Sequence, residues 1–430
     1  MHYIIIGNCA AGVNAVEAIR DVDKKSEITV ISEENYPAYC RCLISEYLAG
    51  EREENQLLYR EEDFYEKNNV SLSLGEKVVQ VEPKNKRIVT KSGKKISYDR
   101  LLIATGARPK GLGIPGEDKE GVFGFRTLDD AKKIKELAEN GDKVLVFGGG
   151  LIGLKASYAL RKKGLDVEVI VKSARILSRV TDEKAAQMMG SRLIENGINI
   201  RTGFDPTEIL GDKRVKGARL DNGKRVSGDI VIIGKGVVCN KELVEDSGIR
   251  THWGIIADDY LKTNLSDIYV AGDVAETKDV ILKEKTTNAL WTDATEQGKV
   301  AGENMTGRKK IYPGSMAANS IEFFSLPLIS VGYVRVRNKG YEELFRLNEQ
   351  DCIYKKLVIK EKRLVGVVLL NAIENAGVYT ALIRRGVDIS KIKDILLENY
   401  FDYALVRDLL EKKEGFRESI SITGDLVKTA

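Results

Sequence analysis

Short apolar runs alternate along the first two thirds of the chain with stretches whose apolar residues recur at helical spacing. The first repeat of this order comprises an apolar run over residues 3–6, an amphipathic stretch over 14–20 and an apolar run over 27–31. A second repeat has apolar runs over 144–147 and 167–171 on either side of a helical pattern. This alternation is typical of β-α-β units and predicts parallel sheets.

Two further apolar runs, over 101–104 and 268–271, end close to a glycine and predict additional strands. Beyond about residue 312 the pattern changes and predicts an α+β module. Its expected antiparallel strands are 330–336, 353–359 and 364–370, and its expected helices are 374–385, with Gly386 as the C-cap, and a stretch from 388 onward.

The composition excludes several classes of protein. Hydrophobic residues make up 43% and charged residues 31% of the 430 residues, a globular balance with room for two or three domains. A net charge of +4 does not indicate nucleic-acid binding. Only two histidines, His2 and His252, are present, which argues against zinc motifs and His-based triads. The five cysteines are scattered, so we expect a reducing cytoplasm and neither a disulfide framework nor a metal site.

No apolar run approaches the ~18 residues that a membrane span needs. The apolar start, residues 3–6, lacks a basic leader and runs directly into a glycine, so it does not have the pattern of a signal peptide. We therefore expect no membrane partner.

The first glycine turn lies between a predicted strand and a predicted helix. A helix N-terminus presents unpaired N–H groups and a partial positive charge to a pyrophosphate, and small residues let the backbone approach it. Glu33, about 20 residues after the turn, is placed to accept from ribose hydroxyls. Cys9 replaces the middle glycine of the usual fingerprint, so close approach is strained but not forbidden. The expected dinucleotide contacts in this turn are Gly7, Cys9, Ala10, Ala11 and Gly12.

The second glycine turn, residues 148–153, is a complete GxGxxG between a strand and a helix. The usual acidic partner is missing, because Lys172 ends the next predicted strand and Arg175 follows it. A lysine pairs with a 2′-phosphate, which favours NADPH over NADH; the alternative is that Lys172 faces solvent. The expected contacts of this second dinucleotide are Gly148, Gly150, Leu151, Ile152, Gly153, Lys172 and Arg175.

Two more motifs accompany these turns: Leu-Leu-Ile-Ala-Thr-Gly-Ala-Arg-Pro at 101–109, and a segment at 263–273 that ends in Tyr-Val-Ala-Gly-Asp. The four motifs, in this order, resemble the FAD-dependent pyridine nucleotide-disulfide oxidoreductase superfamily over nearly the whole chain. The resemblance implies an α/β fold with two Rossmann-like three-layer nucleotide-binding domains and a C-terminal α+β interface domain. The implied boundaries are 1–110 and 240–310 for a split FAD domain, 111–239 for an inserted NAD(P)H domain and 311–430 for the interface domain.

The resemblance also implies roles for individual residues. Asp273 would contact the flavin ribitol or its phosphate side, and residues 291–298 would form the helix whose N-terminus faces the flavin O2 edge. A helix N-terminus there would stabilise negative charge on the reduced flavin. Further implied FAD contacts are Arg41, Val79, Ala104, Thr105, Gly106, Arg108, Gly272 and Trp291, and Gly234 is an implied NAD(P)H contact.

Two branches of the superfamily compete over residues 39–50. This stretch resembles the single-arginine motif of rubredoxin and ferredoxin reductases and of the flavin part of nitrite reductases, which have proline where this chain has Cys42. It also resembles the NADH oxidase, NADH peroxidase and coenzyme A-disulfide reductase branch, in which Cys42 falls on the redox cysteine. Ala10 stands where the peroxidases have a histidine, which counts against that branch. Cys42 is therefore either a thiolate stabilised by Arg41 or a small buried residue in a proline-like slot.

Two charges are reversed relative to the common family pattern. Glu46 stands where members often have a lysine near flavin N5, and Lys155 stands where they often have a glutamate. One hypothesis is that the two residues pair beside the redox rings, and the alternative is that one or both point to solvent.

The tail, over 312–330 and 376–384, resembles NADH:rubredoxin-type oxidoreductases, above all those that accompany carbon monoxide dehydrogenase and its ferredoxin-like subunit. This implies a cytoplasmic FAD enzyme that exchanges electrons between NADH or NADPH and an iron–sulfur carrier of the ferredoxin or rubredoxin type. One alternative is an NADH oxidase or disulfide reductase that uses Cys42. Another is a non-catalytic flavin scaffold in which Lys155 and Lys172 have abolished nucleotide binding. The resemblance is compatible with a homodimer.

Overall fold

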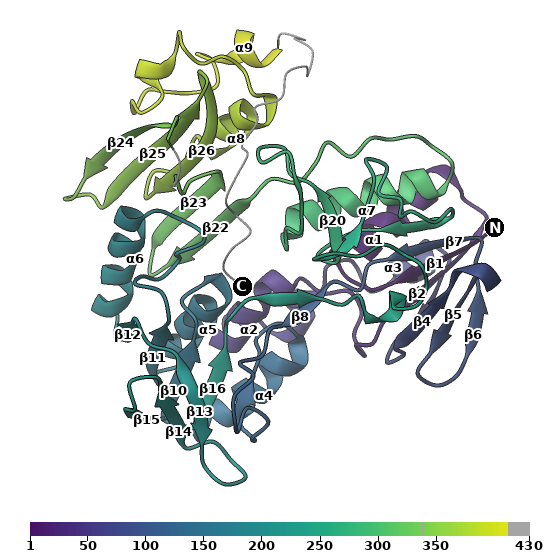
Figure 1. The fold of residues 1–430 in the computed structure, drawn as a ribbon, viewed down its shortest axis with the longest axis horizontal. Coiled ribbons are helices and arrows are strands. Elements are labelled where there is room, and N and C mark those ends of the chain that lie inside the picture. The colour runs from purple at the N-terminus through teal and green to yellow at the C-terminus, as the bar shows by residue number, and fades with distance from the viewer. Residues whose placement is uncertain (337–338, 412–430) are drawn as a thin grey trace.

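The computed structural model describes residues 1–336 and 339–411. Two parallel sheets covered by helices and one antiparallel sheet near the end of the chain form its three parts (Figure 1). The α/β class with two Rossmann-like units and a C-terminal α+β module is confirmed.

The first parallel sheet has the strand order β19-β7-β1-β2-β3. Its strands are β1 (His2–Ile6), β2 (Glu27–Ile31), β3 (Val70–Ser73), β7 (Arg100–Ile103) and β19 (Ile268–Val270). Ile4, Ile5 and Leu101 are fully buried, as the apolar runs of a sheet covered on both faces require. Because β19 pairs with β7, this sheet joins the beginning of the chain to a segment far along it.

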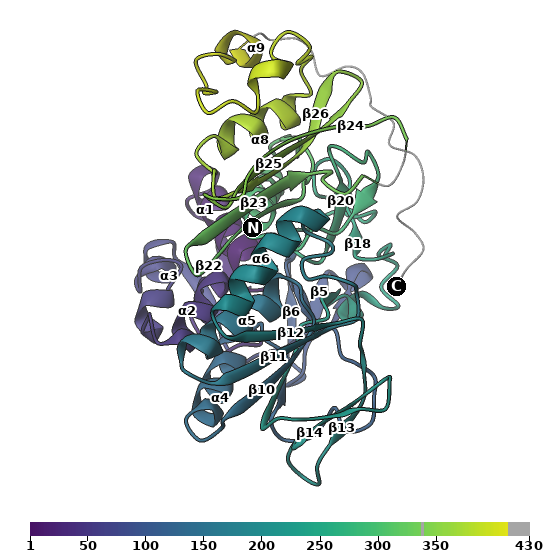
Figure 2. The ribbon, with the colours of Figure 1, turned by 90° about the vertical axis from the view of Figure 1, so that its left-hand side faces the viewer.

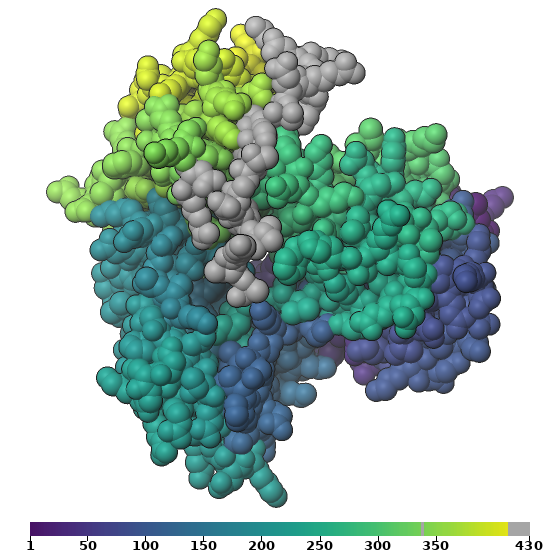
Figure 3. Space-filling model, in the orientation of Figure 1, coloured from purple at the N-terminus to yellow at the C-terminus, as the bar shows by residue number. Residues whose placement is uncertain are grey.

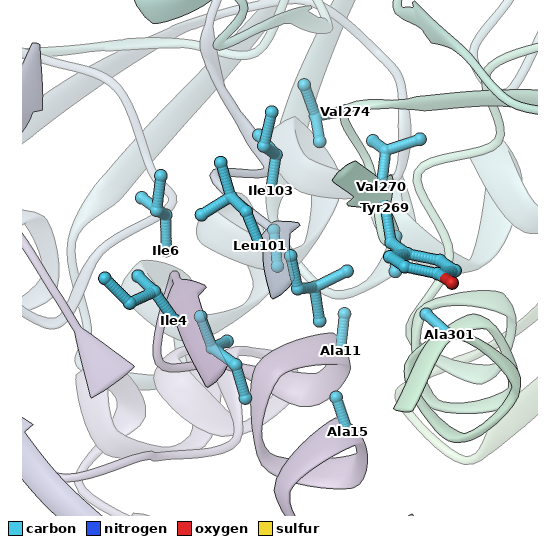
Figure 4. Packing of buried hydrophobic residues seen from close by; sticks show 14 of the residues in the cluster. Ile4, Ile6, Ala11, Ala15, Leu101, Ile103, Tyr269, Val270, Val274 and Ala301 are labelled. Atoms are coloured by element: carbon cyan, nitrogen blue, oxygen red, sulfur yellow. The ribbon is translucent and has the colours of Figure 1, made fainter. Parts of the chain in front are cut away.

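Helices α1 (Ala10–Val22) and α7 (Trp291–Met305) pack side by side on this sheet, as Figure 4 shows around Ala11, Ala15 and Ala301. A Cβ atom at Gly298 would lie 2.2 Å from the carbonyl oxygen of Ala11, and one at Gly302 would lie 2.6 Å from that of Ala15. Glycine is therefore required at both positions. The two pairs also show that the helices run in the same direction, so the N-terminus of α7 faces the same side as the first glycine turn.

Smaller elements complete this first part of the molecule. Helices α2 (Ile44–Ala49) and α3 (Phe64–Lys67) lie between β2 and β3 in the sequence. An antiparallel sheet comprises β4 (Val78–Glu82), β5 (Arg87–Thr90) and β6 (Lys95–Ser97), and a short sheet comprises β18 (Ile255–Ile256), β20 (Ala275–Lys278) and β21 (Lys285–Thr286).

The second parallel sheet has the order β12-β11-β10-β16-β9. Its strands are β9 (Val122–Phe123), β10 (Lys143–Phe147), β11 (Asp166–Val171), β12 (Ile198–Thr202) and β16 (Ile230–Ile233). Its helices are α4 (Leu128–Ala138), α5 (Leu151–Lys162) and α6 (Glu183–Glu195), and an antiparallel sheet adds β13 (Pro206–Leu210), β14 (Gly217–Leu220) and β15 (Arg225–Ser227). Strands β8 (Ala107–Pro109) and β17 (Val237–Cys239) pair antiparallel, one before this unit in the chain and one after it.

The C-terminal module is an antiparallel sheet of order β22-β23-β26-β25-β24 with α8 and α9 beside it. Its elements are β22 (Ala318–Phe323), β23 (Leu326–Gly332), β24 (Glu342–Asn348), β25 (Ile353–Lys360), β26 (Arg363–Leu370), α8 (Ala376–Arg385) and α9 (Arg407–Glu411). Figure 2 shows β22 of this module beside α6 of the second unit, and Figure 3 shows the module in contact with that unit. The contact is a packed core, because Phe323 is buried against Tyr158 of α5.

Two sequence expectations for this module need correction. The strand expected at 330–336 is β23, which ends at Gly332 and forms a hairpin with β22. The hairpin turn is Phe324-Ser325, with φ of 48° and 58°; these are unusual residues for a two-residue turn, and Pro327 lies inside the strand. The helix expected from residue 388 onward is wrong within the described residues, which form only a short 3-10 turn and α9 there. The C-cap at Gly386, with φ 57°, is confirmed.

Candidate functional site

The first glycine turn leaves the N-terminus of α1 without a cap from the protein. The N-cap residue Cys9 makes no side-chain capping bond, and the first backbone bond of the helix runs from Val13 N–H to the Cys9 carbonyl at 3.0 Å. The N–H groups of Ala10, Ala11 and Gly12 therefore have no acceptor in the part of the chain that the structure describes. By contrast, α4 and α6 are capped by Thr127 and Asp182.

The outer glycines of this turn are fixed by backbone crowding. Gly7 has φ of +119°, and a Cβ there would lie 2.1 Å from the carbonyl oxygen of Ala104. A Cβ at Gly12 would lie 2.0 Å from the Gly7 carbonyl oxygen. Cys9, with φ of −136°, is in ordinary extended backbone, so its side chain causes no backbone strain. The substitution at the middle position therefore leaves the turn intact.

The second turn repeats this arrangement at α5. Gly148 has φ of +124°, and a Cβ there would lie 2.3 Å from the Gly234 carbonyl oxygen; a Cβ at Gly153 would lie 2.1 Å from that of Gly148. The N-cap residue Gly150 makes no side-chain capping bond, and a Cβ there would meet no atom within 4 Å. The N–H groups of Leu151 and Ile152 have no hydrogen-bond acceptor among the described residues. We call the two turns the first and second cradles.

The residues after β11 form the basic edge of the second cradle. The Lys172 side chain is 78% exposed, and its Nζ lies 3.3 Å from Oδ2 of Asp205, which also pairs with Lys235. The Arg175 Nε is buried and has no hydrogen-bond partner among the described residues. An orphaned guanidinium nitrogen and an exposed lysine in one loop fit an anionic group such as a 2′-phosphate.

Residues from three other strand ends surround the first cradle. Thr105 Oγ1 donates to the Asn240 carbonyl at 2.7 Å, beside Ala104 and Gly106, and Arg108 pairs with Glu242. Gly272 N–H donates to Gln297 Oε1 of α7 at 2.7 Å. Asp273 Oδ2 lies 2.7 Å from Arg126 Nη2, in a pair that is mostly buried.

Sequence reasoning missed Arg126 and Gln297, which hold the Gly-Asp motif. Arg126 lies just before the Thr127 cap of α4, and a Cβ at Gly106 would lie 3.5 Å from its Nη2. The guanidinium therefore lies between the two strand-end motifs of the first cradle. The signal in the sequence was weak, because Arg126 is far from both motifs along the chain.

Three other expected FAD contacts lie at the margins of the site. Glu33 is exposed, and its Oε1 lies 2.9 Å from Lys77 Nζ. The Val79 side chain on β4 is 44% exposed. Trp291 begins α7 and packs edge-on against Tyr59, with 4.9 Å between the ring centroids. The residue beside Glu33, Glu34, ion-pairs with Arg41.

The cysteine segment departs from the sequence hypotheses. Arg41 binds Glu34, the Tyr39 hydroxyl and the Arg126 carbonyl, whereas the cation beside Cys42 is Lys155, whose Nζ lies 3.4 Å from the Cys42 carbonyl. Successive side chains of a 3-10 turn point in different directions, which separates Arg41 from its neighbour. The hypothesis that Arg41 stabilises a Cys42 thiolate is therefore not supported by these contacts.

The thiol beside it, Cys40, is the more acidic one. A hydrogen bond from Cys42 lowers the pKa of Cys40 to about 6, and the same bond raises the pKa of Cys42. The proposed pairing of Glu46 with Lys155 is wrong, because Glu46 ion-pairs with Arg52. The side chain of Glu46 points to Arg52 in the loop after α2, whereas Lys155 contacts Cys42 in the segment before α2.

A buried acid in the first turn of α7 was also missed. Asp293 is 1% exposed, and its Oδ2 has no hydrogen-bond partner among the described residues. Burial raises the pKa of Asp293 to about 7, although Arg384 opposes the shift. An aspartate in the first turn of a helix is favoured by the helix dipole and is usually exposed, so its burial was not evident from the sequence.

Taken together, the residues fit the two cofactors that the motifs imply. Each cradle presents uncapped helix N–H groups at the carboxyl end of a parallel sheet, with glycines where any Cβ would strike the backbone. Among the described residues, no helix is long and apolar enough to cross a membrane.

Comparison with known proteins places these features in a family context. Residues 1–298 match the family model "Pyridine nucleotide-disulphide oxidoreductase", and residues 318–387 match "Rubredoxin NAD+ reductase C-terminal domain". The chain is 33% identical to nitrite reductase [NAD(P)H] of Bacillus subtilis over 91% of this chain and 48% of that protein. It is 36% identical to the NADH oxidase of Methanocaldococcus jannaschii over 73% of this chain and 72% of that protein.

Among solved structures, the ferredoxin reductase of Rhodopseudomonas palustris is similar, with a TM-score of 0.80 and 28% identity over 86% of this chain and 91% of that one. The chain spans about half the length of the first curated relatives it matches, with 48% and 51% of their lengths covered.

Proposed function

Because the chain belongs to the pyridine nucleotide-disulphide oxidoreductase family, we propose that it is an FAD-dependent NAD(P)H oxidoreductase that exchanges electrons with an iron–sulfur carrier of the ferredoxin or rubredoxin type. The observation that carries this proposal is that α1 and α5, one on each parallel sheet, each begin without a side-chain cap directly after a glycine turn. The match of the C-terminal module to a rubredoxin reductase domain supports the choice of carrier.

In this proposal, FAD binds the first cradle and NAD(P)H the second. The corresponding units are 1–110 with 240–310 for FAD, 111–239 for the nucleotide, and 311–430 for the interface. The antiparallel β8–β17 pair, which connects the two parallel-sheet units, supports boundaries near residues 110 and 240.

The bound cofactors supply the redox chemistry: hydride transfer between nicotinamide and flavin, and single-electron exchange with the carrier. The protein binds and orients them. The N-termini of α1 and α5 bind the two pyrophosphates through backbone N–H groups. Arg126 holds the Asp273 carboxylate in place, and Gln297 fixes the backbone of Gly272 beside it. Lys172 and Arg175 bind the adenosine phosphate of NADPH.

The test is anaerobic stopped-flow mixing of the FAD-loaded protein with NADH and with NADPH, followed by reoxidation with a ferredoxin or a rubredoxin. We expect rapid bleaching of the flavin band and reoxidation by one carrier. A protein that stays colourless after reconstitution would overturn the proposal. A flavin that neither nucleotide bleaches would instead favour the non-catalytic scaffold.

A second candidate function is that of a thiol-using NADH oxidase or disulfide reductase. The paired thiols of Cys40 and Cys42 beside Lys155 favour it. The discriminating variant is Cys42→Ser: the thiol enzyme would lose turnover, whereas the carrier reductase would keep it. Thiol titration before and after reduction with NAD(P)H is an independent test, because only the thiol enzyme would gain free thiols on reduction.

Partners and location complete the proposal. We propose a carbon monoxide dehydrogenase complex as the source or recipient of the carrier's electrons, a homodimer as the working assembly, and the cytoplasm as its location. The sequence of the tail supports the first, and five unpaired cysteines support a reducing compartment. Light scattering of the FAD-loaded protein tests the dimer, and carrier reduction coupled to carbon monoxide oxidation tests the complex.

A further inference from the structure

The segment Leu177 to Asp182 connects the second cradle to α6 and supports the cradle directly. The Leu177 N–H donates to the Gly149 carbonyl at 2.7 Å, inside the glycine turn. Ser178 Oγ lies 3.2 Å from Ser173 Oγ, next to Lys172. The segment therefore contacts both parts of the nucleotide site, the turn and the basic loop.

This segment holds a strained residue. Leu177 has φ of +49°, in the left-handed region that a leucine rarely adopts, and it is 1% exposed. Such a conformation persists only where the surrounding structure enforces it. The residues that follow Leu177 in the segment are bound from outside the second unit.

The C-terminal module binds this segment at three successive points. Ser330 Oγ of β23 donates to the Val180 carbonyl, and Arg335 Nη1 donates to the Ser178 carbonyl at 2.9 Å. The hydroxyl of Tyr354 on β25 donates to Asp182 Oδ2 at 2.6 Å.

An ion pair reinforces the third point. Lys356, also on β25, has its Nζ 3.3 Å from the same Asp182 oxygen and pairs with Glu343 as well. The Lys356 side chain is only 8% exposed, so its charge depends on these carboxylates. The other oxygen of Asp182 caps α6 by accepting from Ala185 N–H at 3.1 Å. Asp182 therefore ties α6, the segment and the C-terminal module together.

We propose that Ser330, Tyr354 and Lys356 are positioning residues for nicotinamide-nucleotide binding: the C-terminal module holds residues 177–182 so that the second cradle keeps the shape that accepts the dinucleotide. This inference rests on the proposed function of the second cradle. The three residues do not touch the nucleotide; they act through Leu177, Ser178 and Asp182. We call Ser330, Tyr354 and Lys356 the clamp. When a clamp contact is lost, the backbone of Leu177 leaves its strained conformation, and the Gly149 carbonyl loses the N–H that donates to it.

The experiment measures the dissociation constants of NAD⁺ and NADP⁺ by calorimetry on the FAD-loaded protein, together with the flavin-reduction rate at saturating NAD(P)H. The variants are Tyr354→Phe, Lys356→Met and the milder Ser330→Ala. Tyr354→Phe and Ser330→Ala should each weaken nucleotide binding about fivefold, the effect of one lost hydrogen bond, and Lys356→Met, which removes two ion pairs, should weaken it at least as much. The limiting reduction rate and the FAD content should stay at wild-type values.

Two matched controls separate positioning from general stability. Tyr379→Phe removes a buried hydroxyl of the same module that donates to Leu396, away from the second unit. Lys393→Met breaks an ion pair with Glu342 in the same module. Both should leave nucleotide binding unchanged.

Unchanged dissociation constants in all three clamp variants would overturn the inference, as would equal weakening in the controls or a lower limiting rate with intact binding. Ser330→Ala, with its small change, keeps the test decisive if a larger substitution prevents folding. A wild-type protein that binds neither nucleotide would instead overturn the proposed function.

Discussion

Glycine-to-alanine substitution in two helices should change stability in opposite directions. In Gly190→Ala, on α6, the nearest atom to the new Cβ is a side-chain carbon of Ile176 at 3.8 Å, an ordinary contact. In Gly298→Ala, on α7, the new Cβ would lie 2.2 Å from the Ala11 carbonyl oxygen and 2.9 Å from the Ala11 Cα. The chemical change is the same, so only the packing differs.

The magnitudes follow from the geometry. At Gly190, alanine removes backbone entropy from the unfolded chain and should raise the free energy of unfolding by about 0.5–1 kcal/mol. At Gly298, real side chains keep at least 3.0 Å, so α7 must move away from α1 by most of an ångström. A gap of that size forfeits about a quarter to a half of each dispersion contact, and overpacking of this kind costs about 1–3 kcal/mol.

The substitution at Gly298 should also affect FAD binding, because Ala11 belongs to the first cradle. If α7 shifts, either the first turn of α1 moves with it or a gap opens between the two helices at Ala11. Both changes disturb the backbone N–H groups of the first cradle. We therefore expect Gly298→Ala to lose FAD on gel filtration, whereas Gly190→Ala keeps the wild-type flavin content.

The assay combines thermal unfolding of the FAD-free protein with flavin content per chain. For a chain of this size, 1 kcal/mol corresponds to about 1 °C in Tm. A Gly298→Ala protein with wild-type Tm and full flavin content would refute the packing argument. So would a Gly190→Ala protein that is as destabilised as Gly298→Ala.

Three further predictions concern single side chains. Burial raises the pKa of Asp293 to about 7, so between about pH 4 and pH 7 the folded protein holds a proton that the unfolded chain has released. The free energy of unfolding should therefore fall as the pH rises through this range. Urea unfolding should show a flatter dependence on pH for Asp293→Asn. The Cys42 hydrogen bond lowers the pKa of Cys40 to about 6, so iodoacetamide at pH 7 should label Cys40 before Cys42, as peptide mass spectrometry can determine. Lys172→Glu should raise the KM for NADPH about tenfold and leave that for NADH nearly unchanged, and equal effects on both would contradict a 2′-phosphate contact.

The order of the elements was readable because it depends on local patterns. Apolar runs such as residues 3–6 are buried on both sides of a parallel sheet, and a glycine turn after each run marks the start of a helix. Crowding at Gly12 and Gly153, each against the first glycine of its own turn, is also a local backbone effect, which is why both cradles could be located from spacing alone. The hairpin at Phe324-Ser325 was missed because its turn residues carry no glycine or asparagine signal.

The sequence by itself determined two glycine-turn cradles, their helices and a C-terminal module of different class, because these follow from the hydrophobic period and from glycine sterics. Only the tertiary structure decided which charges meet. Glu46 forms an ion pair with Arg52 and not with Lys155. Arg41 pairs with Glu34 and does not contact the Cys42 thiol, and Asp273 pairs with Arg126. Side-chain partners depend on how separate elements dock in space, and long flexible side chains reach whichever neighbour that docking brings within about 3 Å.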